Sequence, residues 1–288
     1  MEKISSSKRT SLHVALIACA LAALLPASAA ERAAPNFAPD STTGWIAAGQ
    51  EFLPPSSGPG PVTFDPQRRP VPGRPAFRVA DLSNPILQPW VRDELQKANA
   101  RALSGRAAYT PKERCWPIGV PGFLLYPVFP VYFIQTPQKI VMIWAEDHQA
   151  RHIYMNQGHS ARVTPSWFGE SVGRYEGDTL VVDTVGLNTR TFVDNYRTPH
   201  TDKLHVVERF RMVDDGRAME VEVHVEDEGA FTTPWNAIQR YRRIDANHTE
   251  DDSRVPRGPM EEAVCAENNG DILNEGVEPI PQSATPDF

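Results

Sequence analysis

The chain has 288 residues, of which 41% are hydrophobic, and its formal net charge is −7. Acidic residues outnumber basic ones by 36 to 29, and no basic stretch is interleaved with aromatic residues. This balance favours solubility and excludes nucleic-acid binding as the expected role.

The first 30 residues have the pattern of a secretory signal peptide. Basic residues precede an apolar stretch at 12–25, and the small residues at 27–30 suit cleavage. The apolar stretch is too short for a stable membrane span. Cys19 follows small residues, so a lipoprotein stays an alternative, although the apolar stretch continues well past it. We therefore expect a periplasmic or secreted protein whose mature chain holds 26 Lys and Arg against 35 Asp and Glu.

Two cysteines, Cys115 and Cys265, remain after removal of the signal peptide. An exported protein meets an oxidising compartment, where two cysteines are a natural count for one disulfide. We predict that they are bonded, which would tie the C-terminal part of the chain to the start of the folded core. The alternative is two buried thiols that are not paired.

Residues 31–111 are predicted to form a Pro-rich arm. Of the 27 prolines in the chain, 17 lie between residues 31 and 130. Proline lacks the backbone N–H that a central strand or a helix interior requires, so we expect extended or irregular backbone. One helix is predicted near 86–103, where apolar residues such as Trp90 and Leu95 recur at helical spacing.

Residues 112–245 are predicted to form an all-β domain. Apolar and polar residues alternate with a period of two, and Glu-Gly-Asp and Asp-Asp-Gly-Arg sequences interrupt the alternation as turns do. The predicted strands are 131–135, 139–146, 149–156, 171–176, 179–187, 204–213, 217–226 and 235–243. Eight strands can close an antiparallel up-and-down barrel, just wide enough for side chains or one small ligand. The remainder, residues 246–288, is predicted to be a loose C-terminal tail.

Several stretches resemble a family of exported bacterial proteins of unknown function. The main one is GRYEGDTLVVDTVG at 173–186, and a second combines Pro199-His200 with LHVVERF at 204–210. Arg114-Cys115 and the residues around Cys265 add to the resemblance, which covers about residues 110–270. It implies a single folded unit and no particular reaction. The nearest architecture is a lipocalin-like barrel.

Three charged residues fall on apolar faces of the predicted strands, namely Glu146, Arg151 and Glu208. A carboxylate is almost never fully buried without a partner, and an apolar setting raises its pKa toward neutrality. Glu208 is therefore a candidate catalytic acid or base, with Arg151 binding a developing negative charge and Glu146 nearby. The alternative is a structural ion pair between Arg151 and one of the two glutamates.

Further candidates lie close to these residues in the sequence. Asp183 interrupts an otherwise apolar strand, which favours an inward position; the alternative is that it pairs with a neighbouring arginine. His205 is a candidate proton shuttle, but it needs an irregular strand to reach Glu208, because perfect alternation sends the two to opposite faces. His200 is expected at the mouth of the barrel. Trp144 and Trp235 are expected to supply flat apolar walls.

These residues suggest an enzyme that performs acid–base chemistry of the lyase or isomerase type without a cofactor or a metal. Its ligand is expected to be a small apolar or aromatic molecule. Two other hypotheses are a non-catalytic carrier of small molecules or lipids, and a structural envelope protein whose barrel is filled.

Overall fold

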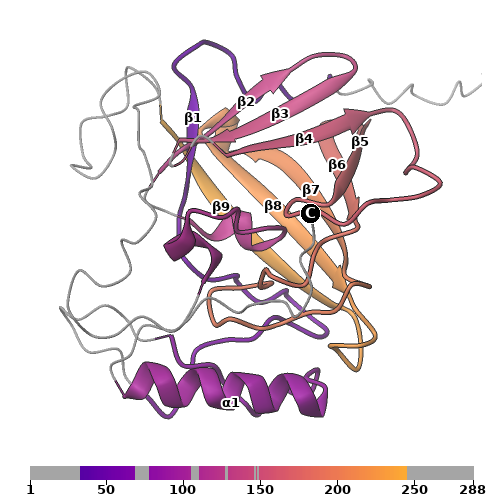
Figure 1. Ribbon diagram of the computed structural model, residues 1–288. Helices are drawn as coiled ribbons and strands as arrows, with labels where there is room; N and C mark the ends of the chain where they lie inside the picture. The colour runs from indigo at the N-terminus through magenta and orange to yellow at the C-terminus, as the bar shows by residue number, and fades with distance from the viewer. Residues whose placement is uncertain are drawn as a thin grey trace, which may run out of the picture. The chain divides into compact units, whose positions relative to one another are not determined.

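The computed structural model describes residues 33–68, 78–104, 110–126, 129–145, 147 and 149–244. The predicted signal peptide, the predicted tail, Glu146 and Cys265 lie outside the described residues. The described chain forms a closed barrel with one α-helix and three short 3-10 helices (Figure 1). The strands are β1 (Gly44–Ala47), β2 (Val131–Gln135), β3 (Lys139–Trp144), β4 (Ala150–Met155), β5 (Glu170–Glu176), β6 (Thr179–Val185), β7 (His205–Val213), β8 (Ala218–Glu226) and β9 (Trp235–Ile244). The helices are α1 (Pro89–Leu103), η1 (Pro111–Arg114), η2 (Gly122–Leu125) and η3 (Asp214–Gly216).

Each strand pairs with the next one in sequence, and β9 pairs with β1 to close the barrel. The predicted all-β barrel is thus confirmed in outline, but the prediction of eight antiparallel strands is wrong in detail. The barrel has nine strands, and β4 and β5 run parallel. All eight predicted strands are present, with boundaries that differ by a few residues.

The extra strand, β1, comes from the Pro-rich arm. It contains the four residues Gly44–Ala47, all buried, so its sequence shows no alternation of apolar and polar residues. Trp45 lies opposite Val131 of β2 and Arg243 of β9, and this double pairing bridges the two ends of the sheet. A short strand buried on both sides carries no period-two signal. The arm therefore completes the barrel, rather than only wrapping around it.

The parallel pair arises from the connection between β4 and β5. Parallel neighbours need a crossover of a dozen or more residues, whereas antiparallel neighbours can be joined by a tight turn. Residues 156–169 form this crossover, and they contain His159. The connection therefore brings a histidine to the β5–β6 part of the sheet.

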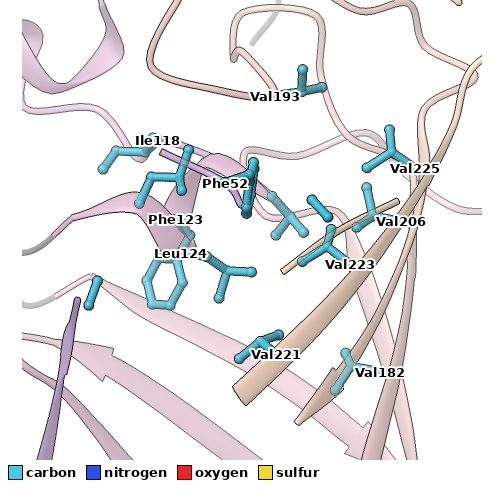
Figure 2. Packing of buried hydrophobic residues seen from close by; sticks show 14 of the residues in the cluster. Phe52, Ile118, Phe123, Leu124, Val182, Val193, Val206, Val221, Val223 and Val225 are labelled. Atoms are coloured by element: carbon cyan, nitrogen blue, oxygen red, sulfur yellow. The ribbon is translucent and has the colours of Figure 1, made fainter. Parts of the chain in front are cut away.

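The inward faces follow the predicted alternation. On β8, Met219, Val221, Val223 and Val225 are all buried, as their spacing indicated. Side chains from the arm and from η2 belong to the same buried cluster as this inner face, and Figure 2 shows Phe52 of the arm and Leu124 of η2 near Val221 and Val223.

Other large side chains occupy the interior as well. The ring of Phe37 lies 4.9 Å from that of Phe133 and 6.4 Å from that of Phe210. The hydroxyl of Tyr241 and the amide of Gln239 both donate to the carbonyl oxygen of Leu124 in η2. The described interior is thus packed with side chains from the arm and from the strands.

Helix α1 confirms the predicted helix, although it begins at Pro89, a residue that suits the first turn because its missing N–H would have no partner there. Its buried side chains include Val91 and Leu95. Trp90, predicted on the buried face, is instead 40% exposed, and its indole N–H donates to the carbonyl oxygen of Gly229. No helix among the described residues is long and apolar enough to cross a membrane.

Candidate functional site

Arg151 of β4 and Glu208 of β7 form an ion pair across the barrel interior. Both side chains are completely buried. Nη1 of Arg151 donates to one carboxylate oxygen of Glu208 at 2.9 Å, and Nη2 donates to the other, so the ion pair is bidentate. Nη2 also donates to the hydroxyl oxygens of Thr184 at 2.9 Å and Ser171 at 3.2 Å. Each charge is thus compensated inside the core.

Both residues were predicted to take part in catalysis, with a structural ion pair as the alternative. Glu208 and Arg151 do point inward, as the alternation predicted, but they form the structural ion pair that was the alternative. Neither side chain has exposed surface on which a substrate could bind. Burial and the charge of Glu208 raise the pKa of Tyr241, which places that phenol in the same apolar setting.

Asp183 and His205 lie together on the other face of the sheet. Strand β7 is regular, so His205 and Glu208 point to opposite faces, and no irregularity brings them together. Asp183 is 30% exposed rather than inward, and one of its oxygens lies 3.0 Å from Nε2 of His205. The predicted cluster of three catalytic residues is therefore wrong, since the structure keeps two of them together and separates the third.

A second histidine, His159, meets the same carboxylate. Its Nε2 lies 3.0 Å from the Asp183 oxygen that also faces His205, and its Nδ1 lies 3.1 Å from Glu170. The hydroxyl and backbone N–H of Ser160 donate to Glu170 and, together with His159, lower the pKa of that carboxyl group. His159 lies in the crossover and shares no strand pattern with the other residues. Its distance of 24 positions from Asp183 is the reason that sequence periodicity missed it.

The row continues onto β8. Nδ1 of His205 lies 3.3 Å from one oxygen of Glu226, and Nε2 of His224 lies 2.8 Å from the other. His224 and then His205 lower the pKa of Glu226. Partial burial opposes protonation of His224, but its hydrogen bonds with Glu226 and Asn236 raise its pKa overall. We call this row the His–carboxylate chain; it consists of Glu170, His159, Asp183, His205, Glu226 and His224.

Each central imidazole of this chain faces two carboxylates. A carboxylate accepts hydrogen bonds, so both contacts of His205 are hydrogen bonds only when both of its ring nitrogens carry a proton. A neutral His205 keeps one contact and leaves the other nitrogen as a proton acceptor. The arrangement can therefore hold or release a proton at a defined atom.

A hollow of about 420 Å³ opens beside His205. It is lined by Lys203, His205, Glu226, Asp227, Glu228, Phe231, Thr232, Thr233 and Pro234, and we call it the His205 hollow. Asp227 fixes its wall, because its carboxylate accepts from the backbone N–H and the hydroxyl of Thr201 at 2.6 and 2.7 Å. This contact joins the connection before β7 to the connection after β8. The lining of the hollow thus combines charged or polar side chains, among them His205 and Glu226, with the apolar Phe231 and Pro234.

His200 lies in the connection between β6 and β7, and its place at the mouth of the barrel stays a prediction. It is 4% exposed, donates from Nδ1 to the carbonyl oxygen of Thr201, and accepts from the hydroxyl of Thr191, both at 2.8 Å. Burial lowers the pKa of His200, so the neutral ring is favoured. His200 therefore supports the connection that leads to Thr201 and the hollow.

The two predicted tryptophan walls are buried. Trp144 packs edge-on against Tyr126 at 4.6 Å. Trp235 packs edge-on against Phe231 at 5.8 Å, so it supports the His205 hollow from behind. Glu146 lies outside the described residues.

In the described part of the chain, no three or more His, Cys, Asp or Glu side chains are arranged to hold a metal ion. No family model, curated protein or solved structure matches this chain. Conclusions about its role therefore rest on the geometry of the site.

Proposed function

We propose that this chain is an exported enzyme that performs acid–base chemistry of the lyase or isomerase type, without a cofactor, in the His205 hollow. The observation that carries the proposal is His205 itself. It forms part of the wall of the hollow and has a carboxylate on each ring nitrogen, at 3.0 and 3.3 Å.

An acid–base isomerase takes one proton from the substrate and returns one at another atom, whereas an acid–base lyase takes a proton and protonates the leaving group. One imidazole can accept the proton in the first step and donate it in the second. Asp183 orients the imidazole by accepting from Nε2, which leaves Nδ1 for proton exchange at the hollow. Glu226 stands beside Nδ1, and its lowered pKa keeps it ionised as the partner of the imidazolium. His205 is the proposed catalytic residue and Asp183 its positioning residue.

The lining of the hollow also supports an apolar part in the substrate. Pro234 is exposed and offers a small apolar surface, while Phe231 is 2% exposed and adds little surface of its own. A ligand with one polar reacting group and one apolar face would find both kinds of side chain in this lining.

The geometry gives less support to a carrier that binds its ligand inside the barrel. Phe210, Tyr241 and the buried Arg151–Glu208 pair occupy inward positions there. The resemblance to exported bacterial proteins of unknown function and the signal-like first 30 residues support the proposal of export.

The test is incubation of the exported protein with a metabolite extract, with mass spectrometry of both bound compounds and new products. His205→Gln keeps a hydrogen-bonding side chain but cannot exchange a proton, so we expect it to lose turnover at least about 100-fold. His152→Gln is the matched control, because His152 is an exposed histidine of β4 that contacts Lys139 rather than the His–carboxylate chain. Full turnover by His205→Gln, or retention of a compound without any product, would refute the enzymatic proposal.

A further inference from the structure

A second hollow adjoins the first one. It has a volume of about 570 Å³ and shares Thr232 and Thr233 with the His205 hollow. It is lined by Gly58, Pro59, Gly60, Pro61, Asp81, Ser83, Asn84, Pro85, Ile86, Thr232 and Thr233, and we call it the proline hollow. Both volumes lie in the range typical of small-ligand sites, about 300–1,000 Å³. A molecule longer than either hollow can therefore cross the two threonines and occupy both.

The wall between the hollows is held in place by backbone hydrogen bonds. The backbone N–H of Thr232 donates to the carbonyl oxygen of Ile86 at 2.7 Å, and its hydroxyl donates to that of Pro85 at 3.1 Å. On the opposite side, the amide of Asn84 donates to the carbonyl oxygen of Pro61 at 2.9 Å. These contacts fix the arm against the connection between β8 and β9. The site is therefore built before a ligand arrives, which lowers the entropic cost of binding.

The chemistry of the proline hollow is uncharged apart from one acid. Among the described residues that line it, Asp81 alone carries a charge. One carboxylate oxygen of Asp81 accepts hydrogen bonds from the backbone N–H and the hydroxyl of Ser83, at 2.9 and 2.7 Å. The other carboxylate oxygen takes part in neither of these two bonds. The rings of Pro59 and Pro85 are exposed and present aliphatic C–H surface, whereas Pro61 is buried. Such a lining suits a group that combines apolar C–H faces with hydroxyl donors.

The charges of the His205 hollow exclude one class of ligand. It carries Glu226, Asp227 and Glu228 against one lysine, Lys203, which is itself paired with Glu228 at 2.5 Å. An anionic ligand would meet this excess of carboxylates and be repelled. The carboxylates are complementary to a cation or to a neutral ligand whose hydroxyl groups donate to them, and we commit to the neutral hydroxyl-bearing class because it also suits the aliphatic proline hollow.

We propose that the proline hollow is a second subsite of the same substrate. We also propose that this substrate is an elongated, uncharged, hydroxyl-bearing molecule of the class of short neutral oligosaccharides and glycosides. This inference rests on the proposed function, since the reducing end, whose open-chain carbonyl makes the neighbouring C–H acidic, lies at His205 and the remainder lies against the proline rings.

The test measures binding to the full-length exported protein by calorimetry. The probes are neutral oligosaccharides of glucose, galactose, mannose and xylose, together with their phenyl glycosides, and an oligogalacturonate serves as the anionic probe. Ser83→Tyr places a ring in the proline hollow away from His205, and we expect it to weaken binding of the best neutral probe by at least about tenfold. Ser104→Tyr is the matched control, because Ser104 is an exposed serine that also makes one local hydrogen bond, to the carbonyl oxygen of Arg101 at the end of α1.

His205→Gln separates this inference from the proposed function. We expect that variant to bind the neutral probe within about threefold of the unmodified protein while losing turnover. Binding of a neutral probe that Ser83→Tyr weakens and Ser104→Tyr does not would support the subsite even if no product forms. Failure of all neutral probes to bind, equal binding by both serine variants, or preference for the anionic probe would each overturn the inference.

Discussion

Arg151 and Glu208 show how one residue can be placed correctly by sequence and still be misread in its role. Period-two alternation puts both on inward faces, and the structure agrees. A buried carboxylate is either a group with a raised pKa or one half of an ion pair. Only the position of Arg151 across the barrel decides between these, because its guanidinium meets both carboxylate oxygens.

We predict that Glu208→Gln destabilises the fold by about 3–5 kcal/mol, because it leaves Arg151 buried without a counter-charge. Urea denaturation followed by fluorescence would measure the change. Glu222→Gln, a neighbouring but exposed glutamate on β8, is the control and should change stability by less than about 0.5 kcal/mol. If Glu208→Gln instead kept full stability and lost turnover, Glu208 would be catalytic after all.

His200 gives a prediction about pH. Its pKa is lowered by burial from an ordinary value of 6.5, so the unfolded chain takes up a proton on this residue before the folded chain does. The neutral, buried His200 therefore contributes fully to the free energy of unfolding above about pH 6.5. This contribution decreases as the pH falls below 6.5 toward the lowered pKa of the folded protein. His200→Asn should flatten the curve of unfolding free energy against pH below about pH 6.5. Parallel curves for the two proteins would contradict the assignment.

At the scale of elements, the crossover between β4 and β5 determines the candidate site. It makes these strands parallel and carries His159 to Asp183, where it completes the His–carboxylate chain. The same pairing brings Gly173 of β5 against β4. A Cβ atom at Gly173 would lie 2.7 Å from a methyl carbon of Ile153 and 2.9 Å from the sulfur of Met155, closer than such atoms approach. Close packing between β4 and β5 therefore favours glycine at position 173, because a larger residue would clash with β4.

We predict that Gly173→Ala destabilises the protein by about 1–3 kcal/mol through overpacking between β4 and β5. Thermal unfolding would measure the loss. Gly49→Ala is the control, because no atom lies within 4 Å of a Cβ built at that position. An unchanged melting temperature for Gly173→Ala would mean that the two side chains move aside at little cost.

At the scale of the whole molecule, the arm and the barrel form one unit. Strand β1 closes the sheet, Phe37 fills the interior, and residues 58–61 help to form the proline hollow. Removal of the arm should therefore unfold the barrel rather than release it, since the arm supplies a strand that pairs on both sides.

The predicted disulfide also belongs to this scale. Cys265 lies outside the described residues, so the bond to Cys115 stays a prediction. We expect alkylation of the exported protein without reductant, followed by mass spectrometry, to leave both thiols unmodified. Cys265→Ser should lower stability by about 2–5 kcal/mol, because the bond restricts a long loop of the unfolded chain. Labelling of both cysteines in the native protein would refute the pairing.

The local features of this protein could be predicted from its sequence. Alternation identified eight strands and the inward position of Glu208 and Arg151, and helical spacing identified α1, because these patterns depend on neighbours a few residues apart. Three further features depend on contacts between distant residues: β1 closes the barrel, β4 and β5 are parallel, and Asp183 meets His159 and His205 on the outer face. Such contacts join residues far apart in the chain, and a periodic pattern holds no information about which distant strand or loop becomes the neighbour.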